Sequence, residues 1–267
     1  MTKFEDLKKN FIDNAPEYCN KHGLSILIDR LWQYHRTNDD RNKFISRLNK
    51  YQKNSTENEW YSLYAELHSL YLINKDLSDR DFAVFSKEEN NDLILCKNSD
   101  NKNIEIKSIL LKNFEKKYSA LWGRLENISS GKAVEFEIKN FNKIDGAFKE
   151  VEELENRGIS DYDGENIKIK VVQDINNKNK TALIGQVLVG WIPAEHLKNL
   201  IVRKIKDKDN QIEKADILIF YLHDSTYDID DLQQVFKEVS NKLPIIKEKI
   251  VKCFTKWDGE KLIDIYL

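Results

Sequence analysis

The hydrophobic period of this chain first changes between Tyr71 and Phe82, and that change constrains its fold more than any other feature. Before it, apolar residues recur every three or four positions, as they do on the buried face of helices. Residues 82–109 instead hold three short apolar runs separated by polar, Asn-rich connectors, which is the pattern of a strand meander. The sequence therefore predicts an α+β fold in which helices precede a sheet.

The region before the change is predicted to be entirely helical. We expect residues 1–54 to form an N-terminal helical lobe, because no alternating strand pattern interrupts them. A further helix should begin after Thr56, since Thr56 and Glu59 have the spacing of a capping box. Glu66 falls on the border of the apolar face of that helix. The apolar segments of the lobe are Phe4–Ile12, Leu24–Trp32 and Phe44–Tyr51.

The rest of the chain mixes both periods. A long helix should follow the third strand and end at Gly131, and residues 132–192 should add strands with one helix among them. The predicted elements after them are a basic helix from Pro193 through Gln211, a buried central strand at Ala215–Tyr221, a helix near 230–242 and a terminal hairpin turning at Asp258-Gly259. We interpret the chain as an N-terminal lobe (1–54), a core (55–228) and a C-terminal helix with hairpin (229–267).

Composition excludes several classes of protein. Lys and Arg number 43 against 45 Asp and Glu, so the net charge of −2 argues against a protein that coats nucleic acid by charge alone. A hydrophobic content of 40% excludes intrinsic disorder. The sequence has no apolar run of about 18 residues, no secretory leader pattern and only three distant cysteines, so we expect a cytoplasmic protein without a membrane span.

The residues with the clearest chemical meaning lie on one predicted helix and two predicted strands. Glu105 and Lys107 are two positions apart and should project from one face of their strand, with Ile104 and Ile106 on the other. If the strand that starts at Asp92 pairs antiparallel with it, Asp92 approaches Glu105. Two carboxylates and a backbone carbonyl suit Mg²⁺, and a neighbouring lysine can orient a water or stabilise charge on a phosphate. This chemistry cleaves phosphodiesters.

The order of these residues resembles the PD-(D/E)xK nuclease superfamily, the fold of many restriction and repair endonucleases. Tyr64–Leu67 is similar to the helix that carries the first acid, Asn91–Leu95 to the Pro-Asp strand, and Ile104–Lys107 to the (D/E)xK strand. The helix with Lys204, Lys208 and Gln211 and the strand after it resemble the later core helix and fourth strand. The resemblance spans roughly residues 56–224, and it departs from the family pattern at Asn91, where the family has proline.

This resemblance implies a restriction-endonuclease-like mixed β-sheet flanked by helices, and an enzyme that hydrolyses DNA. It implies an endonuclease of restriction, repair or defence type that uses Mg²⁺, with Mn²⁺ as a substitute. Asp92, Glu105 and Glu66 would bind the metal, and Lys107 would be catalytic together with Asp92 and Glu105. Lys204, Lys208 and Gln211 would bind the substrate or support the site.

Several alternatives stay open at this point. Glu137 and Lys139 form a second E-x-K triplet on a predicted strand, although no aspartate-bearing strand is well placed before it. The chain could be a non-catalytic binding or assembly protein that keeps the nuclease fold, or a nuclease directed at RNA, for which the sequence has no aromatic RNP-like pattern. A homodimer is a further hypothesis, because two-fold DNA suits a two-fold protein.

Overall fold

The computed structural model describes residues 3–35, 37–50, 55–78, 81–86, 91–97, 100–110, 112–129, 132–139, 144–155, 157–158, 160–174, 182–185, 194–207, 209–223, 227, 229–255 and 261–267. The predicted helix end at Gly131 lies outside them. The chain divides into two compact units. The first comprises Met1–Leu110 and Lys198–Leu267, and the second comprises Leu111–Leu197. The second unit is thus inserted between two segments of the first.

A six-stranded mixed sheet forms the centre of the first unit, in the order β1-β2-β3-β8-β9-β10. The first three strands are the predicted antiparallel meander, and β8 then runs parallel to β3 and β9 parallel to β8. β10 closes the sheet as the predicted antiparallel hairpin with β9, whose turn at 258–259 lies outside the described residues. The strands are β1 (Phe82–Phe85), β2 (Leu93–Lys97), β3 (Asp100–Leu110), β8 (Ile217–His223), β9 (Ile250–Phe254) and β10 (Ile263–Ile265).

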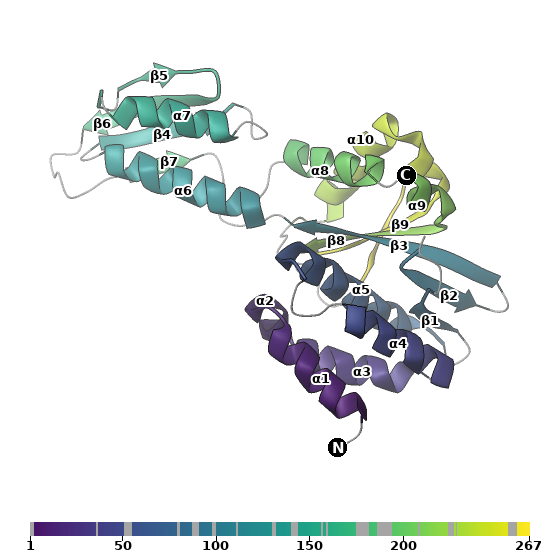
Figure 1. Cartoon of the computed structure of the whole chain (residues 1–267). Helices are drawn as coiled ribbons and strands as arrows, with labels where there is room; N and C mark the ends of the chain where they lie inside the picture. Colours follow the sequence, from purple (N-terminus) through teal and green to yellow (C-terminus); the bar gives the residue numbers. More distant parts are fainter. Residues whose placement is uncertain are drawn as a thin grey trace. The chain divides into compact units, whose positions relative to one another are not determined.

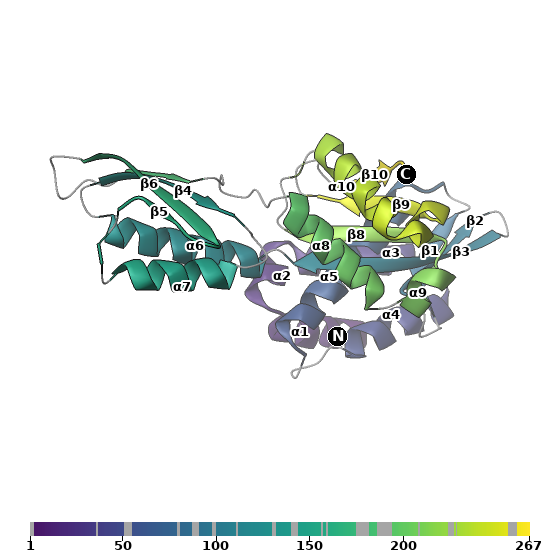
Figure 2. The same cartoon turned by 90° about the horizontal axis from the view of Figure 1, so that it is seen from above.

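Helices cover both faces of this sheet, as Figure 1 and Figure 2 show. The N-terminal helices lie on one face: α1 (Lys3–Asn14), α2 (Glu17–Lys21), α3 (Leu24–Tyr34), α4 (Asn38–Lys50) and α5 (Glu57–Asp76). The other face carries α8 (Ala194–Lys206), α9 (Asp209–Lys214) and α10 (Ile229–Lys242), and a 3₁₀ helix at Pro244–Glu248 precedes β9. The sheet is therefore the middle layer of three, and β8 is buried along its whole length, as predicted for a central strand.

The N-terminal lobe is helical as predicted, and its core is continuous with that of the sheet. Leu31 and Phe44 belong to the same buried cluster as Leu67 of α5 and Ile106 of β3. α5 begins with the predicted capping box: the Glu59 amide donates to Thr56 Oγ1, and the Thr56 amide donates to Glu59 Oε2 at 2.6 Å. This continuity brings side chains of the N-terminal helices to the sheet.

The second unit contains a four-stranded sheet in the order β5-β6-β4-β7 and two helices that pack against each other. It holds the additional strands that the alternating pattern of 132–192 predicts. Val134, Phe136 and Ile138 of β4 are buried, whereas Glu135 and Glu137 between them are exposed. Its elements are α6 (Lys112–Ile128), β4 (Lys132–Ile138), α7 (Ile144–Glu155), β5 (Tyr162–Asp163), β6 (Ile167–Asp174) and β7 (Ala182–Gly185).

The prediction of one continuous basic helix through Gln211 is wrong. α8 ends at Lys206 and α9 starts at Asp209, so two helices replace the one expected. Aspartate disfavours helix interiors because its side chain competes for backbone hydrogen bonds, and Asp207 directly follows α8. Separately, none of the helices in the described ranges combines the length and the apolar content needed to cross a membrane.

Candidate active site

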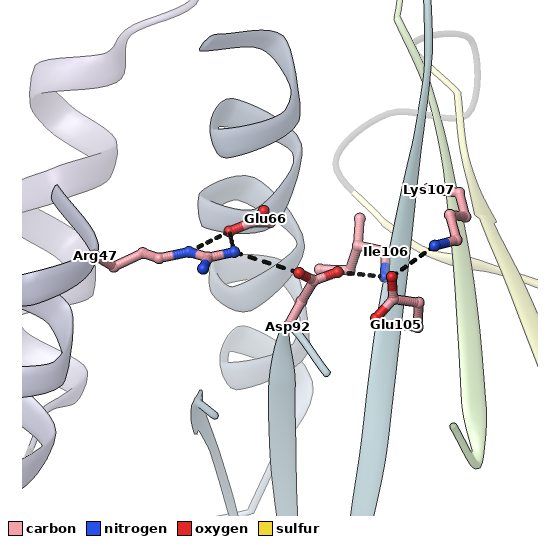
Figure 3. A network of polar contacts seen from close by, with 6 residues as sticks. All are labelled: Arg47, Glu66, Asp92, Glu105, Ile106 and Lys107. Carbon is pink, nitrogen blue, oxygen red and sulfur yellow. Dashed lines mark hydrogen bonds and ion pairs between the residues drawn. The ribbon is translucent and has the colours of Figure 1, made fainter. Parts of the chain in front are cut away.

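The pairing of β2 with β3 places Asp92 beside Glu105. The strands are antiparallel, as predicted, with Leu93 opposite Ile104, and the Asp92 amide donates to the Ile104 carbonyl at 3.1 Å. The Asp92 side chain reaches one step further, where its Oδ2 accepts a hydrogen bond from the Ile106 amide at 2.8 Å (Figure 3). Asp92 therefore lies immediately before β2, and its side chain contacts the backbone of the neighbouring strand β3.

Glu105 and Lys107 share one face of β3, as their spacing predicts. Lys107 Nζ lies 2.6 Å from Glu105 Oε1, and the two side chains are only 4% and 2% exposed. Ile104 and Ile106 face the opposite layer, in the core cluster of the N-terminal helices. A buried ion pair contributes little net stability, because removing both charges from water costs about as much as their attraction returns. The pair is thus a candidate for a functional role.

Glu66 of α5 pairs with Arg47, a residue that was not predicted from the sequence. Arg47 of α4 donates from Nε to Glu66 Oε2 at 2.7 Å, and its Nη2 lies 2.5 Å from the same oxygen. The same Nη2 lies 3.3 Å from Asp92 Oδ1, so the guanidinium bridges the two acids (Figure 3). Arg47 follows the buried Phe44 by three positions and precedes the buried Leu48 by one. Its place on the border of an apolar helix face is the signal that would have identified it.

The three acids lie close enough to influence one another electrostatically. Burial raises the pKa of Glu66 to about 8, with a further upward contribution from the negative charge of Asp92 and a smaller one from Glu105. Arg47 opposes these effects and lowers the pKa through its charge and its hydrogen bond. Glu66, Asp92 and Glu105 are thus brought together from α5, β2 and β3, in the order that the sequence predicts.

These acids do not form a finished metal cage. Within the described ranges, no three His, Cys, Asp or Glu side chains are arranged as a metal-binding group. The reason is visible in the contacts: Arg47 holds Glu66 and one oxygen of Asp92, and Lys107 holds one oxygen of Glu105. The donors themselves are carboxylate oxygens, which a hard divalent cation prefers. A divalent cation could bind these carboxylates only by replacing one of their ion pairs with Arg47 or Lys107.

The predicted substrate-binding residues do not lie along one helix. Lys204 is half-buried on α8, whereas Gln211 is half-buried on α9, and Lys208 lies outside the described residues. Their predicted i, i+4, i+7 alignment is therefore wrong. α9 does contact β3, the strand of Glu105 and Lys107, and Gln211 Oε1 is enclosed without a hydrogen bond to the described residues.

The competing E-x-K triplet has a different environment. Glu137 is exposed on β4 of the second unit, opposite Lys168 of β6. Lys139 is exposed too, and its Nζ donates to the Gly164 carbonyl at 2.7 Å and pairs with Asp163. These contacts are those of a solvated sheet face, whereas Glu105 and Lys107 are buried beside two more acids. The geometry favours Glu105 and Lys107.

A buried histidine lies on the other face of β3. His223 Nε2 is 2.9 Å from the hydroxyl of Ser108, the residue after Lys107, and its Nδ1 is 3.2 Å from the Tyr18 hydroxyl of α2. Burial, with a smaller contribution from the nearby His22, lowers the pKa of His223 to about 3. The neutral imidazole thus joins β8 to β3 and to the N-terminal helices.

Comparisons with known proteins add no relative: no family model, no curated protein and no solved structure matches this chain. The functional argument consequently depends on the contacts among Arg47, Glu66, Asp92, Glu105 and Lys107. The likeness to the nuclease superfamily stays a prediction from the sequence.

Proposed function

We propose that this chain is a divalent-metal-dependent nuclease that hydrolyses DNA phosphodiester bonds. It would act as an endonuclease and would have a restriction-endonuclease-like core. The observation that carries the proposal is the convergence of Glu66, Asp92, Glu105 and Lys107, from three elements, in one largely buried network (Figure 3). A mixed sheet whose antiparallel meander is followed by a parallel strand, with helices on both faces, supports the same proposal.

The acids would serve as ligands. Asp92 and Glu105 would hold Mg²⁺, or Mn²⁺ in its place, and Glu66 would complete the set directly or through water. When bound, such an ion lowers the pKa of a coordinated water and neutralises charge on the phosphate. Asp92 is already oriented for this role, because its Oδ2 is fixed by the Ile106 amide at 2.8 Å.

Lys107 would position the attacking water and stabilise negative charge on the phosphate. Its ammonium group lies 2.6 Å from Glu105 and its side chain is 4% exposed, so its position is defined and its charge is weakly screened. Arg47 adds a second cation on the other side of Asp92. A divalent ion bound beside these carboxylates would add positive charge, which a phosphodiester would partly neutralise.

Cleavage of plasmid DNA tests the proposal. The purified full chain is incubated with supercoiled plasmid in Mg²⁺, in Mn²⁺ and in EDTA. We expect nicked or linear product with either metal, none in EDTA, and a loss of at least about 100-fold in Lys107→Ala. Lys139→Ala is the matched control, because it removes the lysine of the competing triplet and should cleave like the wild type. Absence of metal-dependent cleavage on every form of DNA, or equal rates for Lys107→Ala and wild type, would refute the proposal.

A second candidate is a non-catalytic binding or assembly protein that keeps the same network as a structural element. The ion pairs of Arg47 and Lys107 favour it, because they already compensate the buried acids. Calorimetric titration with Mn²⁺ separates the two candidates. An active site should bind the ion in the wild type and lose binding in Asp92→Asn, whereas a structural network should bind none in either protein.

A further inference from the structure

A hollow of about 660 Å³ lies along α4, and its lining includes Arg47, which contacts Glu66 and Asp92. Six residues of α4 between Asn42 and Lys50 line it, together with Phe85 and Ser86 at the end of β1. Its volume is within the range of about 300–1,000 Å³ that is usual for ligand sites. The hollow is built within the first unit, where α4 packs against β1.

The lining of the hollow is cationic. Lys43, Arg47 and Lys50 are spaced at i, i+4 and i+7, so they share one face of α4, and asparagine and serine side chains lie between them. None of the described lining residues is acidic. Lys43 pairs at 3.2 Å with Asp39 and at 3.6 Å with Asp40, and the pair with the largely exposed Asp39 is weak enough to be exchanged for an anionic ligand.

Arg47 belongs both to the hollow and to the network of acids. Its side chain lines the hollow, and its guanidinium contacts Glu66 at 2.5 Å and Asp92 at 3.3 Å. A polyanion bound against Lys43 and Lys50 would therefore approach Asp92 along the Arg47 side chain. Amide, hydroxyl, lysine and arginine groups are also the side chains that contact phosphate and sugar in protein–DNA complexes.

We propose that this hollow binds the sugar–phosphate backbone of the DNA strand next to the scissile bond. The inference rests on the proposed nuclease function and extends it. The N-terminal helices then supply substrate binding, with Lys43 and Lys50 contacting phosphates and Arg47 linking the hollow to the acids. Lys43 and Lys50 bind without sequence preference, because phosphate contacts position a duplex and carry no base information.

Binding of labelled DNA, followed by fluorescence anisotropy, tests the hollow. Ca²⁺ replaces Mg²⁺ to suppress cleavage, and the full chain is titrated at several salt concentrations. We expect Lys43→Gln/Lys50→Gln to weaken binding about 10-fold and to reduce the slope of log K against log salt by about 2, one for each lost phosphate contact. Lys50→Glu, which leaves the ion pairs of Lys43 intact, should weaken binding more than Lys50→Gln.

The matched control is Lys237→Gln/Lys242→Gln, which removes two exposed lysines of α10 on the other face of the sheet. It should bind DNA like the wild type, and thermal denaturation should show that all variants are folded. Wild-type affinity and salt slope in Lys43→Gln/Lys50→Gln would overturn the inference even if the wild type cleaves plasmid. Tighter binding of RNA than of DNA through the same lysines would overturn the assignment to DNA. DNA binding that depends on Lys43 and Lys50, without any cleavage, would support the proposed DNA-binding role of the hollow and refute the proposed nuclease activity.

Discussion

Arg47 Nη2 lies 2.5 Å from Glu66 Oε2, which pairs an arginine of the N-terminal helices with a buried acid of α5. The Glu66 side chain is 7% exposed and that of Arg47 is 23% exposed, so the pair is mostly shielded from solvent. Because a buried carboxyl that loses its hydrogen-bond partner is costly, this contact helps to hold α4 to α5. The lobe thus contributes a residue to the candidate site.

Arg47→Ala should lower the free energy of unfolding by about 2 kcal/mol, since it leaves the buried Glu66 carboxyl without the hydrogen bond from Arg47. Urea denaturation measures this change. Adding Glu66→Leu to Arg47→Ala should recover part of the loss, because the buried carboxyl is then removed as well. Arg30→Ala, which removes a 2.8 Å hydrogen bond to Tyr71, is the control and should cost about 1 kcal/mol. Equal losses in the two arginine variants would contradict the prediction.

Asp92→Asn should reduce DNA cleavage strongly while changing the free energy of unfolding only slightly. The amide oxygen can still accept the hydrogen bond from the Ile106 amide, so the free energy of unfolding should change by about 1 kcal/mol or less. The loss of charge should reduce plasmid cleavage by at least about 100-fold and weaken Mn²⁺ binding. Urea denaturation, plasmid cleavage and calorimetry report the three quantities. Cleavage at the wild-type rate would exclude Asp92 as a metal ligand.

Glu105→Leu/Lys107→Met should be as stable as the wild type or up to about 3 kcal/mol more stable, although it should not cleave DNA. The substitutions remove both charges of a pair that is 2% and 4% exposed and leave no buried ion behind. Lys107→Met alone should be destabilised by about 3 kcal/mol, because Glu105 keeps its charge. Chemical denaturation compares the variants. A double variant less stable than Lys107→Met would contradict this account of the pair.

On acidification, His223 should lower the free energy of unfolding, whereas Glu66, whose pKa is raised in the folded protein, should raise it. The pKa of His223 is about 3 in the folded protein and near 6.5 in the unfolded chain, so only the unfolded chain takes up a proton on this residue between these values. The contribution of His223 is therefore fully present above about pH 6.5 and decreases below it. Between pH 7 and pH 5 it should reduce the free energy of unfolding by about 2 kcal/mol.

Urea denaturation across this pH range tests the effect. Relative to the wild type, the free energy of unfolding of His223→Gln should be about 2 kcal/mol more favourable at pH 5 than at pH 7, and His196→Gln, at a half-buried position on α8, should keep the wild-type dependence. The same slope in His223→Gln and wild type would assign the dependence to other groups. His35 contributes in the same direction, because burial lowers its pKa too.

The sequence by itself determined the features that depend on neighbours along the chain. Hydrophobic period predicted the N-terminal helices and the meander, and the Thr56–Glu59 spacing predicted the start of α5. The alternation of side chains along a strand placed Glu105 and Lys107 on one face, and the meander placed Asp92 beside β3. These predictions succeed because helix and strand geometry repeats over a few residues.

Only the tertiary structure decided which distant side chains meet. Arg47 contacts acids 19 and 45 residues away, and β3 pairs with a strand that follows the inserted second unit. The break between α8 and α9 also placed Lys204 and Gln211 on different helices, although the sequence pattern had predicted one continuous helix. No local pattern encodes such contacts, because they depend on how α4 packs against α5 and on the register between strands. That packing places a cation between two of the acids.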